Sequence, residues 1–281
     1  MGRRSVLFSP GDQPEMLMKA TETAADVVVF DLEDAVAPER RPAARDAIVD
    51  HLAAVGQHAA AELCVRINPP PVGSDDLEAL SSGAFLPDAI MLPKVTTAAD
   101  IVAAAEDMRA HLDATVPVYA LLERAESIEA AVEIACAEPT TALVFGAEDL
   151  SADIGATAGT DLSELSYARQ RVVLAARIGG VDPIDTVFTD VQDHDGLREQ
   201  TARAHRLGYV GKLVIHPAQI DPVHEAFRPS DAELRWARRV IEHAPPDGGV
   251  YTVEGEMIDA PIRARAERIL RQAGDASKAN R

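Results

Sequence analysis

Short apolar runs in this sequence end in carboxylates, a residue type that binds hard cations. Glu33 and Asp34 follow the first run, Glu123 follows the second, and Glu148 and Asp149 follow the third. Runs rich in branched residues are typical of buried parallel strands, and a barrel of such strands holds its chemistry at their carboxyl ends. Mg²⁺ prefers oxygen ligands and takes one or two protein carboxylates, which leaves its other positions to water and substrate. The sequence therefore predicts a Mg²⁺ site where several strand ends meet.

Strand-like and helix-like segments alternate along the chain, which predicts an α/β fold of the (β/α)₈ TIM-barrel class. Eight strands alternating with helices favour a barrel over a doubly wound sheet. Caps support the helices, as with Thr97 before Ala98–Leu112 and Asp161 before Leu162–Ile178. The strand candidates are Ser5–Phe8, Asp26–Leu32, Leu63–Asn68, Ala89–Lys94, Val116–Glu123, Ala142–Gly146, Ile184–Phe188 and Lys212–His216.

The C-terminal part of the chain exceeds what a barrel needs. We expect residues 1–227 to form the barrel and residues 228–281 to form a C-terminal helical extension that acts as a lid over a site or a neighbour. The expected elements are a helix over Ala218–Phe227, a helix after Ser230 that carries Trp236, a break over Pro245–Gly249 and a final helix from about Pro261.

Composition and charge fit a cytoplasmic enzyme. The 281 residues are 47% hydrophobic, which is ample for a core, and nothing resembles a membrane span or a signal segment. A formal net charge of −19 argues against nucleic acid or an anionic membrane as the main partner. Scarce lysine beside this acidic excess indicates a high-salt cytoplasm, although a GC-rich genome explains the same pattern. Cys64 and Cys136 are expected to be two reduced core thiols.

Seven motifs occur in an order and at spacings typical of one enzyme family. They are Leu7–Gly11, Asp31–Val36, Val65–Asn68, Met91–Lys94, Gly146–Leu150, Gly211–Pro217 and Gly255–Asp259. Through them the chain resembles the citrate lyase β-subunit-like and malyl-CoA lyase family of the HpcH/HpaI aldolase superfamily over nearly its whole length. The resemblance implies a Mg²⁺-dependent barrel, with Mn²⁺ as a substitute metal, that cleaves or forms carbon–carbon bonds next to a thioester. It also implies a homotrimer or a dimer of trimers.

The family's metal ligands match Glu123 and Asp149 position for position. Cleavage of a 3-hydroxyacyl thioester yields a thioester enolate and a 2-oxo acid. A metal bound by these two carboxylates can chelate the hydroxyl and the adjacent carboxylate of the substrate. The alternative interpretation is that both acids only cap the helices that follow them.

Arg66 is the candidate catalytic cation, because its permanently charged fork can face an enolate oxygen or a carboxylate. A buried ion pair with Glu33 or Asp34 is the simpler interpretation, and both can hold. Glu33 and Asp34 are expected to orient metal-bound water and Arg66, or to serve only as structural support. Lys94 can compensate the acidic cluster, but a Schiff-base role is disfavoured because neighbouring carboxylates keep a lysine protonated.

The coenzyme A half of the substrate is assigned through the resemblance. It implies contacts from Phe8, Ser9, Lys19 and the Ile215-His216-Pro217 turn. Lys94 and Glu148 are also expected among the substrate-binding residues. Gln13 stands where malyl-CoA lyases often carry an arginine, so phosphate binding at that point is in doubt. His216 can be an acid, a base or a positioning hydrogen bonder. The other histidines show no metal spacing and are expected at the surface.

Asp259 is the predicted acid–base group, carried by a lid that reaches the active site of a neighbouring subunit. It lies in a Gly-Glu-Met-Ile-Asp segment, as it does in the family's lid, and could protonate the enolate carbon on the face away from the metal. The competing interpretation is that Asp259 simply caps the helix near Pro261.

Three functions stay open at this stage. The favoured one is a lyase that acts on malyl-CoA, citramalyl-CoA or a near relative and releases acetyl-CoA or a related acyl-CoA and a 2-oxo acid. The second is a thioesterase on the same substrates. The third is a citrate lyase β-subunit that acts on an acyl-carrier-protein thioester within a complex.

Overall fold

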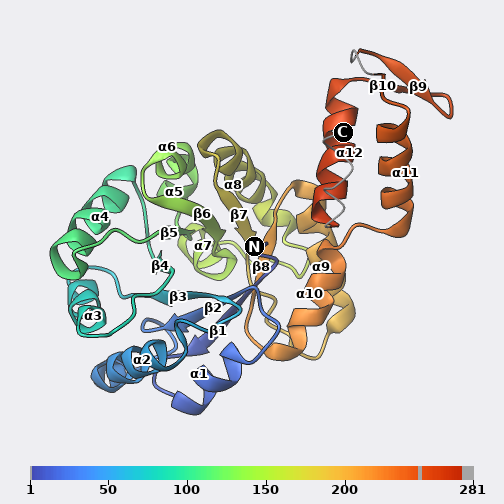
Figure 1. The fold of residues 1–281 in the computed structure, drawn as a ribbon. Helices are drawn as coiled ribbons and strands as arrows, with labels where there is room; N and C mark the ends of the chain where they lie inside the picture. The colour runs from blue at the N-terminus through green and yellow to red at the C-terminus, as the bar shows by residue number, and fades with distance from the viewer. Residues whose placement is uncertain (1, 246–248, 274–281) are drawn as a thin grey trace. The chain divides into compact units, whose positions relative to one another are not determined.

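The computed structural model describes residues 2–245 and 249–273, and the larger part of it is a closed barrel of eight parallel strands (Figure 1). Each strand pairs with the next one along the chain, and the last pairs with the first, with Ser5 beside Lys212. The strands are β1 Ser5–Pro10, β2 Val27–Asp31, β3 Glu62–Arg66, β4 Ala89–Leu92, β5 Val118–Leu122, β6 Thr140–Phe145, β7 Asp182–Asp185 and β8 Gly211–Val214. The predicted TIM barrel is confirmed, with every strand within three residues of its expected bounds.

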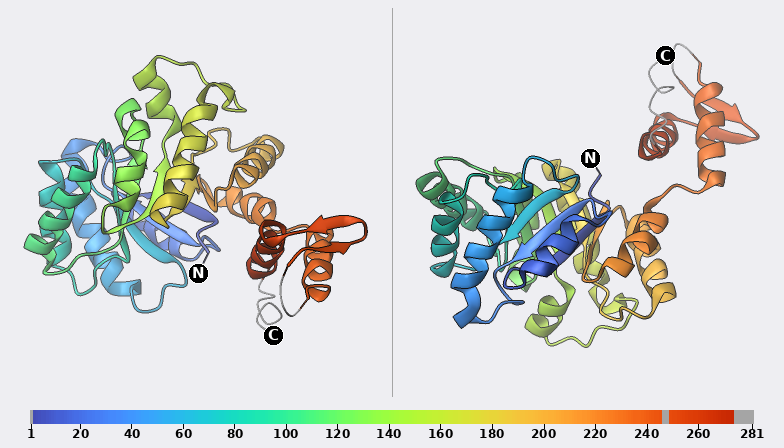
Figure 2. Two further views of the ribbon diagram at one scale, coloured as in Figure 1. Left: turned by 90° about the horizontal axis from the view of Figure 1, so that it is seen from above. Right: turned by 60° about the horizontal axis from the view of Figure 1, so that its bottom comes forward.

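Figure 2 shows helices around the strands of the barrel, and most residues of these strands are buried. The helices of the barrel unit are α1 Pro14–Thr21, α2 Arg41–Val55, α3 Val72–Ser81, α4 Ala98–Leu112, α5 Ala125–Glu129, α6 Ala131–Cys136, α7 Ala147–Ile154, α8 Ser166–Gly179, α9 His194–Leu207 and α10 Ile220–Phe227, with 3₁₀ turns η1 Pro38–Arg40, η2 Ser163–Leu165 and η3 Pro217–Gln219.

One of the two expected helix caps is right and the other is wrong. Thr97 begins α4 as predicted, and its backbone N–H donates to Asp100 at 2.8 Å. Asp161 instead accepts from the N–H of Ser163 at 3.2 Å, and Leu162 has a left-handed φ of 53°. The chain therefore makes a turn and a 3₁₀ segment first, so α8 begins only at Ser166.

The barrel interior is filled by alternating inward residues of the strands, as the packing of such barrels requires. The fully buried members of this cluster are Val6, Val27, Val29, Cys64, Ala89, Met91, Tyr119, Ala142, Val144 and Ile184. Cys64 is a core thiol as expected, and burial raises its pKa well above the usual value. The same expectation is wrong for Cys136, which ends α6 and is exposed.

The chain divides into two compact units, Met1–His224 and Glu225–Arg281, with the boundary inside α10. The second unit contains α11 Asp231–Glu242, the strands β9 Tyr251–Val253 and β10 Glu256–Ile258, and α12 Ala260–Gln272. Its two helices run side by side and share a small apolar core with the hairpin (Figure 1). The expected helices after Ser230 and from about Pro261 are confirmed, whereas the hairpin was not predicted. Residues 246–248 of the expected break lie outside the described residues.

The hairpin of β9 and β10 turns through two residues. Glu254 and Gly255 both have positive φ, 51° and 87°, which is what a tight two-residue hairpin turn requires.

Within the described ranges, none of the helices combines the length and apolar character needed to span a lipid bilayer.

Candidate active site

A cavity of about 380 Å³ opens at the carboxyl ends of the barrel strands. Seven strand ends contribute to its wall, which is why residues distant in sequence meet there. Of the residues predicted to form a site, the wall includes Phe8, Asp34, Arg66, Glu123, Glu148, Asp149 and Ile215. It also includes Asp31, Gly146, Ala147 and Thr186, to which the sequence assigned no contact with substrate.

Glu123 follows β5 and is 3% exposed, and its Oε1 accepts the backbone N–H of Lys94 at 2.7 Å. Gly146 lies against it, because an added Cβ there would come within 2.7 Å of the Glu123 Cβ. Asp149 reaches the same cavity from the first turn of α7. The two predicted metal ligands therefore share one cavity.

The electrostatics of Glu123 favour a nearby cation. Burial is the main cause that raises the pKa of Glu123 to about 7, with the neighbouring charges of Asp149 and Glu33 adding to it and the Lys94 N–H opposing it. No group of three or more His, Cys, Asp or Glu residues suited to a metal occurs in the part of the chain that the structure describes. Two carboxylates in a water-accessible cavity are nevertheless the donor set that Mg²⁺ uses, since water and substrate complete its coordination.

Arg66 ends β3 and is held by three carboxylates. Its Nε and Nη2 donate to the two oxygens of Asp31 at 2.7 and 2.6 Å. Its Nη1 lies 3.2 Å from Glu33 Oε2 and 3.6 Å from Asp34 Oδ2. The guanidinium stands 4.9 Å from the ring centre of Phe8, a cation–π contact. The pKa of Arg66 is raised: burial opposes the charge, but the bonds to Asp31 outweigh it.

Asp31 is the partner of Arg66 that sequence reasoning missed. The expected ion pair with Glu33 exists, but the bidentate contact goes to Asp31, which stands directly beside Arg66 in the register of β2 and β3. Residues that pair in the register of adjacent parallel strands are neighbours. Asp31 and Arg66 are the last residues of β2 and β3, so an alignment of the two strand ends could have found this pair.

Lys94 contacts protein carboxylates. Its Nζ donates to Glu33 Oε1 at 2.7 Å, and that bond raises the lysine's pKa, in line with the expectation against a Schiff base. Burial raises the pKa of Glu33 although Lys94 and Arg66 oppose the shift.

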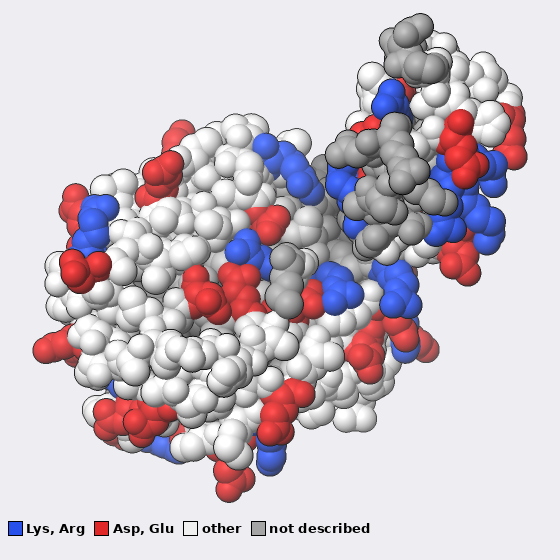
Figure 3. All heavy atoms as spheres, in the orientation of Figure 1, with Lys and Arg blue, Asp and Glu red and all other residues white. Residues whose placement is uncertain are grey.

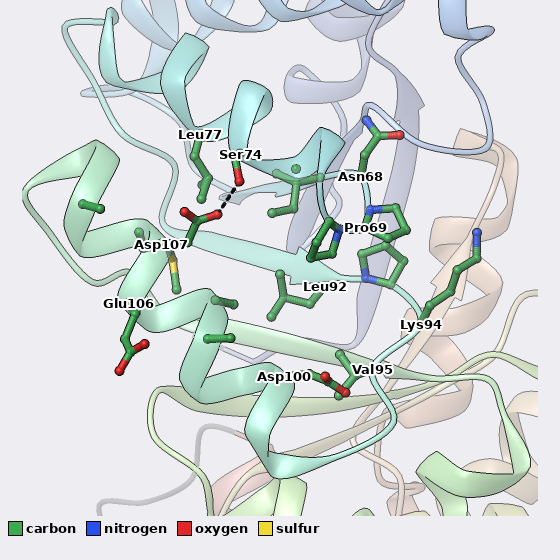
Figure 4. Close-up of a pocket in the computed structure, with 18 residues that line it drawn as sticks. Asn68, Pro69, Ser74, Leu77, Leu92, Lys94, Val95, Asp100, Glu106 and Asp107 are labelled. Carbon is green, nitrogen blue, oxygen red and sulfur yellow. Dashed lines mark hydrogen bonds between the residues drawn. The ribbon is translucent and has the colours of Figure 1, made fainter.

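A second cavity of about 550 Å³ lies between α3 and α4, with Lys94 on its edge (Figure 4). The Lys94 side chain points away from that space, across which Ser74 donates to Asp107 at 2.8 Å. The acids Asp100, Glu106 and Asp107 on its wall disfavour an anionic ligand.

Thr186 links β7 to α7, the helix that carries the predicted metal ligand Asp149. Its hydroxyl accepts the N–H of Ala147 at 3.1 Å, at the start of the helix that carries Asp149. On its other side, the Thr186 carbonyl accepts from Lys212 Nζ at 2.8 Å, and Lys212 is completely buried. A lone threonine gave no sequence signal for this role.

The remaining predicted substrate residues are not brought into the cavity wall. Ser9 is 1% exposed on β1, and its hydroxyl oxygen has no hydrogen-bond partner within the described residues. Lys19 is exposed in the last turn of α1. His216 and Pro217 are exposed after β8, where His216 Nδ1 accepts from the N–H of Ala218 at 3.1 Å, so this histidine serves the turn.

Asp259 is the N-cap of α12, and its Oδ1 accepts from the N–H of Ile262 at 3.1 Å. The competing interpretation from the sequence, a helix cap, therefore holds in this chain. Its catalytic role at a neighbouring subunit stays a prediction.

Two histidines expected at the surface are instead packed against the barrel. His51 is 9% exposed and stacks edge-to-face on Phe30 at 5.3 Å between ring centres. His224 Nε2 lies 2.7 Å from the buried Ser5 hydroxyl and 3.7 Å from Asp26. Because Ser5 and Asp26 both approach the same ring nitrogen, this trio is a structural contact rather than a nucleophilic triad.

Family models locate the chain among known proteins. The model described as HpcH/HpaI aldolase/citrate lyase matches residues 4–217, and a model of the TIM-barrel fold carbon–carbon bond lyases matches residues 184–275. The chain belongs to the HpcH/HpaI aldolase/citrate lyase family.

Similar family members carry lyase and thioesterase names. Mitochondrial citramalyl-CoA lyase of Rattus norvegicus is 35% identical, with 95% of this chain and 85% of that protein covered. The (3S)-malyl-CoA thioesterase of Cereibacter sphaeroides is 36% identical, with 91% and 89% covered. The crystal structure of CitE from Mycobacterium tuberculosis with magnesium, acetoacetate and coenzyme A has a TM-score of 0.84 and 37% identity, and covers 97% of this chain and 98% of that one.

Proposed function

We propose that this protein is a Mg²⁺-dependent lyase that cleaves a 3-hydroxyacyl-CoA thioester, such as malyl-CoA or citramalyl-CoA, to acetyl-CoA or a related acyl-CoA and a 2-oxo acid. The observation that carries the proposal is one cavity whose wall includes two candidate metal carboxylates, Glu123 and Asp149, and a guanidinium, Arg66. The family and the solved relative with magnesium and coenzyme A support it.

Glu123 and Asp149 would hold Mg²⁺, which when bound supplies a Lewis acid for the hydroxyl and carboxylate of the substrate. The first turn of α7 would bind the same carboxylate through the N–H groups of Glu148 and Asp149, since the helix dipole favours an anion at this end. Arg66, fixed by Asp31, would stabilise the enolate oxygen that develops on the thioester half. The fold thus provides a place for each of the two charges that carbon–carbon cleavage creates.

Asp259 would donate the proton that the enolate carbon needs, and would do so from the lid of a neighbouring subunit in a homotrimer or a dimer of trimers. The support for this is the family-like motif and the placement of Asp259 in a unit with its own core. Its bond to Ile262 leaves the second carboxylate oxygen for other contacts.

Incubation with malyl-CoA, citramalyl-CoA and citryl-CoA in the presence of Mg²⁺, with separate assays for 2-oxo acid and free thiol, tests the function. We expect equal amounts of 2-oxo acid and acyl-CoA, full dependence on Mg²⁺ or Mn²⁺, and loss of activity in Glu123→Gln and Asp149→Asn. Asp107→Asn, in the separate cavity between α3 and α4, is the matched control and should keep activity. Full turnover by extensively chelated enzyme would contradict the metal assignment.

A thioesterase is the second candidate, and the similarity to the (3S)-malyl-CoA thioesterase favours it. That activity releases free thiol and the intact hydroxy acid, without 2-oxo acid, so the same two assays separate it from the lyase. Turnover that occurs only with an acyl-carrier-protein thioester and co-purifying subunits would indicate a citrate lyase β-subunit instead.

A further inference from the structure

Lys94 combines an unusual backbone with two contacts to the candidate site. Its φ is 56°, a left-handed conformation that non-glycine residues seldom adopt. Its backbone N–H donates to Glu123 Oε1 and its ammonium donates to Glu33 Oε1, both at 2.7 Å. Glu123 and Glu33 are each 3% exposed, so both bonds reach buried carboxylates. Backbone strain that persists beside a site is a sign that the site uses it.

The backbone N–H of Lys94 donates the hydrogen bond that holds the carboxylate of Glu123, the proposed metal ligand. Within the described residues it is the one hydrogen bond found for the Glu123 carboxylate, and Gly146 closes the opposite side, where an added Cβ would lie 3.1 Å from Oε2. That N–H belongs to the peptide that enters the left-handed turn at residue 94, so it keeps its direction only while the turn keeps its shape. A residue that cannot keep this conformation would turn the N–H away and leave the carboxylate without its partner.

The ammonium of Lys94 acts at a different point. It binds one oxygen of Glu33, while the other oxygen lies 3.2 Å from Arg66 Nη1. Removal of the ammonium therefore releases one of the carboxylates that surround Arg66, but it leaves the bond to Glu123 in place.

We propose that Lys94 is a positioning residue with two separable actions: its left-handed backbone orients Glu123 for the metal, and its ammonium orients Glu33 and thereby Arg66. This inference rests on the proposed function and goes beyond it, because it assigns to Lys94 a role toward protein carboxylates in place of the substrate contact expected from the sequence.

The two actions can be separated with Lys94→Asn and Lys94→Val. Both substitutions remove the ammonium, but asparagine tolerates the left-handed conformation and a β-branched residue does not. Mn²⁺ affinity, measured from the electron paramagnetic resonance signal of the free ion, should be weaker in Lys94→Val than in Lys94→Asn by about 10-fold or more, the usual effect of losing a partner of a metal ligand. Lys94→Asn should bind Mn²⁺ as the natural protein does yet show a lower kcat, and Lys94→Arg should restore most of that kcat.

Asp113 provides the matched control. It is exposed at the end of α4 and has a left-handed φ of 50°, so Asp113→Asn and Asp113→Val impose the same pair of backbone changes away from the site. These variants should differ in melting temperature but not in Mn²⁺ affinity. Should Lys94→Val fail to fold, Lys94→Gly and Lys94→Ala give the same comparison with less strain.

The outcomes distinguish this inference from the proposed function. Equal Mn²⁺ affinity in Lys94→Asn and Lys94→Val would overturn the inference alone. A natural protein that binds no Mn²⁺ would overturn the proposed function and the inference with it.

Discussion

Arg66, the proposed catalytic cation, is held in one orientation by its neighbours. Asp31 fixes the plane of the guanidinium with two bonds, and Glu33 and Asp34 flank its remaining Nη1. A bidentate contact of this kind needs the planar fork of arginine, which lysine cannot reproduce. The catalytic value of Arg66 should therefore lie in its shape as well as in its charge.

Arg66→Lys keeps the charge and loses the fork, so we expect kcat to fall by about 10²-fold or more if the residue stabilises developing enolate charge. Steady-state kinetics with the preferred thioester measures the effect, and circular dichroism verifies the fold. A normal kcat with only a raised KM would show that Arg66 serves substrate binding in the ground state.

Thr186 should position the helix that carries Asp149. Thr186→Val removes the hydroxyl that accepts the Ala147 N–H, so we expect a weaker Mn²⁺ affinity by about 10-fold, while Thr186→Ser keeps the bond and the affinity. Thr201→Val is the control, because Thr201 is also buried but its hydroxyl donates within α9, to the Leu197 carbonyl. If Thr186→Val and Thr201→Val bind the metal alike, Thr186 has only a structural role.

At the scale of elements, the contact between α1 and α2 contains a buried titratable group. His51 of α2 lies against Phe30 of β2, and its Nε2 is 3.4 Å from the Thr21 hydroxyl at the end of α1. Burial lowers the pKa of His51, because the charged form is poorly solvated there. The folded protein therefore favours the neutral imidazole.

This depressed pKa makes stability depend on pH. Neutral His51 contributes to the free energy of unfolding. This contribution is present above the unfolded-state pKa of about 6.5 and is lost as the pH falls through the lower folded-state pKa. Thermal unfolding between about pH 7.5 and pH 5 should thus show a smaller decline for His51→Gln than for the natural protein. His58→Gln, at an exposed histidine, should leave the decline unchanged. Identical declines for all three proteins would contradict the prediction.

The whole molecule has an uneven charge distribution. Residues 225–281 hold ten acidic and ten basic residues, so the entire net charge of −19 belongs to residues 1–224. Figure 3 shows acidic side chains spread over the visible face of the barrel, with some basic ones between them, and both signs on the second unit. Repulsion within the folded state should therefore concentrate in the barrel.

Salt should relieve this repulsion, and we expect the melting temperature to climb as KCl rises from low to molar concentration. Differential scanning fluorimetry over a KCl series measures the change. A flat melting temperature would leave codon bias as the explanation for the scarce lysine.

The lid hypothesis belongs to the scale of the assembly. Asp259→Asn should abolish cleavage but keep α12, because asparagine caps helices as well as aspartate does, and it should leave Mg²⁺ and thioester binding intact. Mixing Asp259→Asn with Glu123→Gln protein should restore partial activity through hybrid oligomers. No recovery in verified mixed oligomers would argue that the lid acts on its own barrel or not at all.

The sequence by itself determined the barrel, the order of its strands and the carboxylates and arginine at the strand ends. These follow from local signals: apolar runs with the strand period, helix caps such as Thr97, and motifs that keep Glu123 and Arg66 at strand termini and Asp149 just beyond one. Each signal lies within a few neighbouring residues, so it can be recognised without knowledge of the fold.

Only the tertiary structure decided which of these groups touch. The pairing of Asp31 with Arg66 depends on strand register, and the bond from Lys94 to Glu123 depends on a backbone angle set by packing. The burial of His51 depends on how two helices meet the barrel wall. Such contacts join segments distant in sequence, and their partners are fixed by the closure of the barrel and by the packing of the helices on it, which no local pattern encodes.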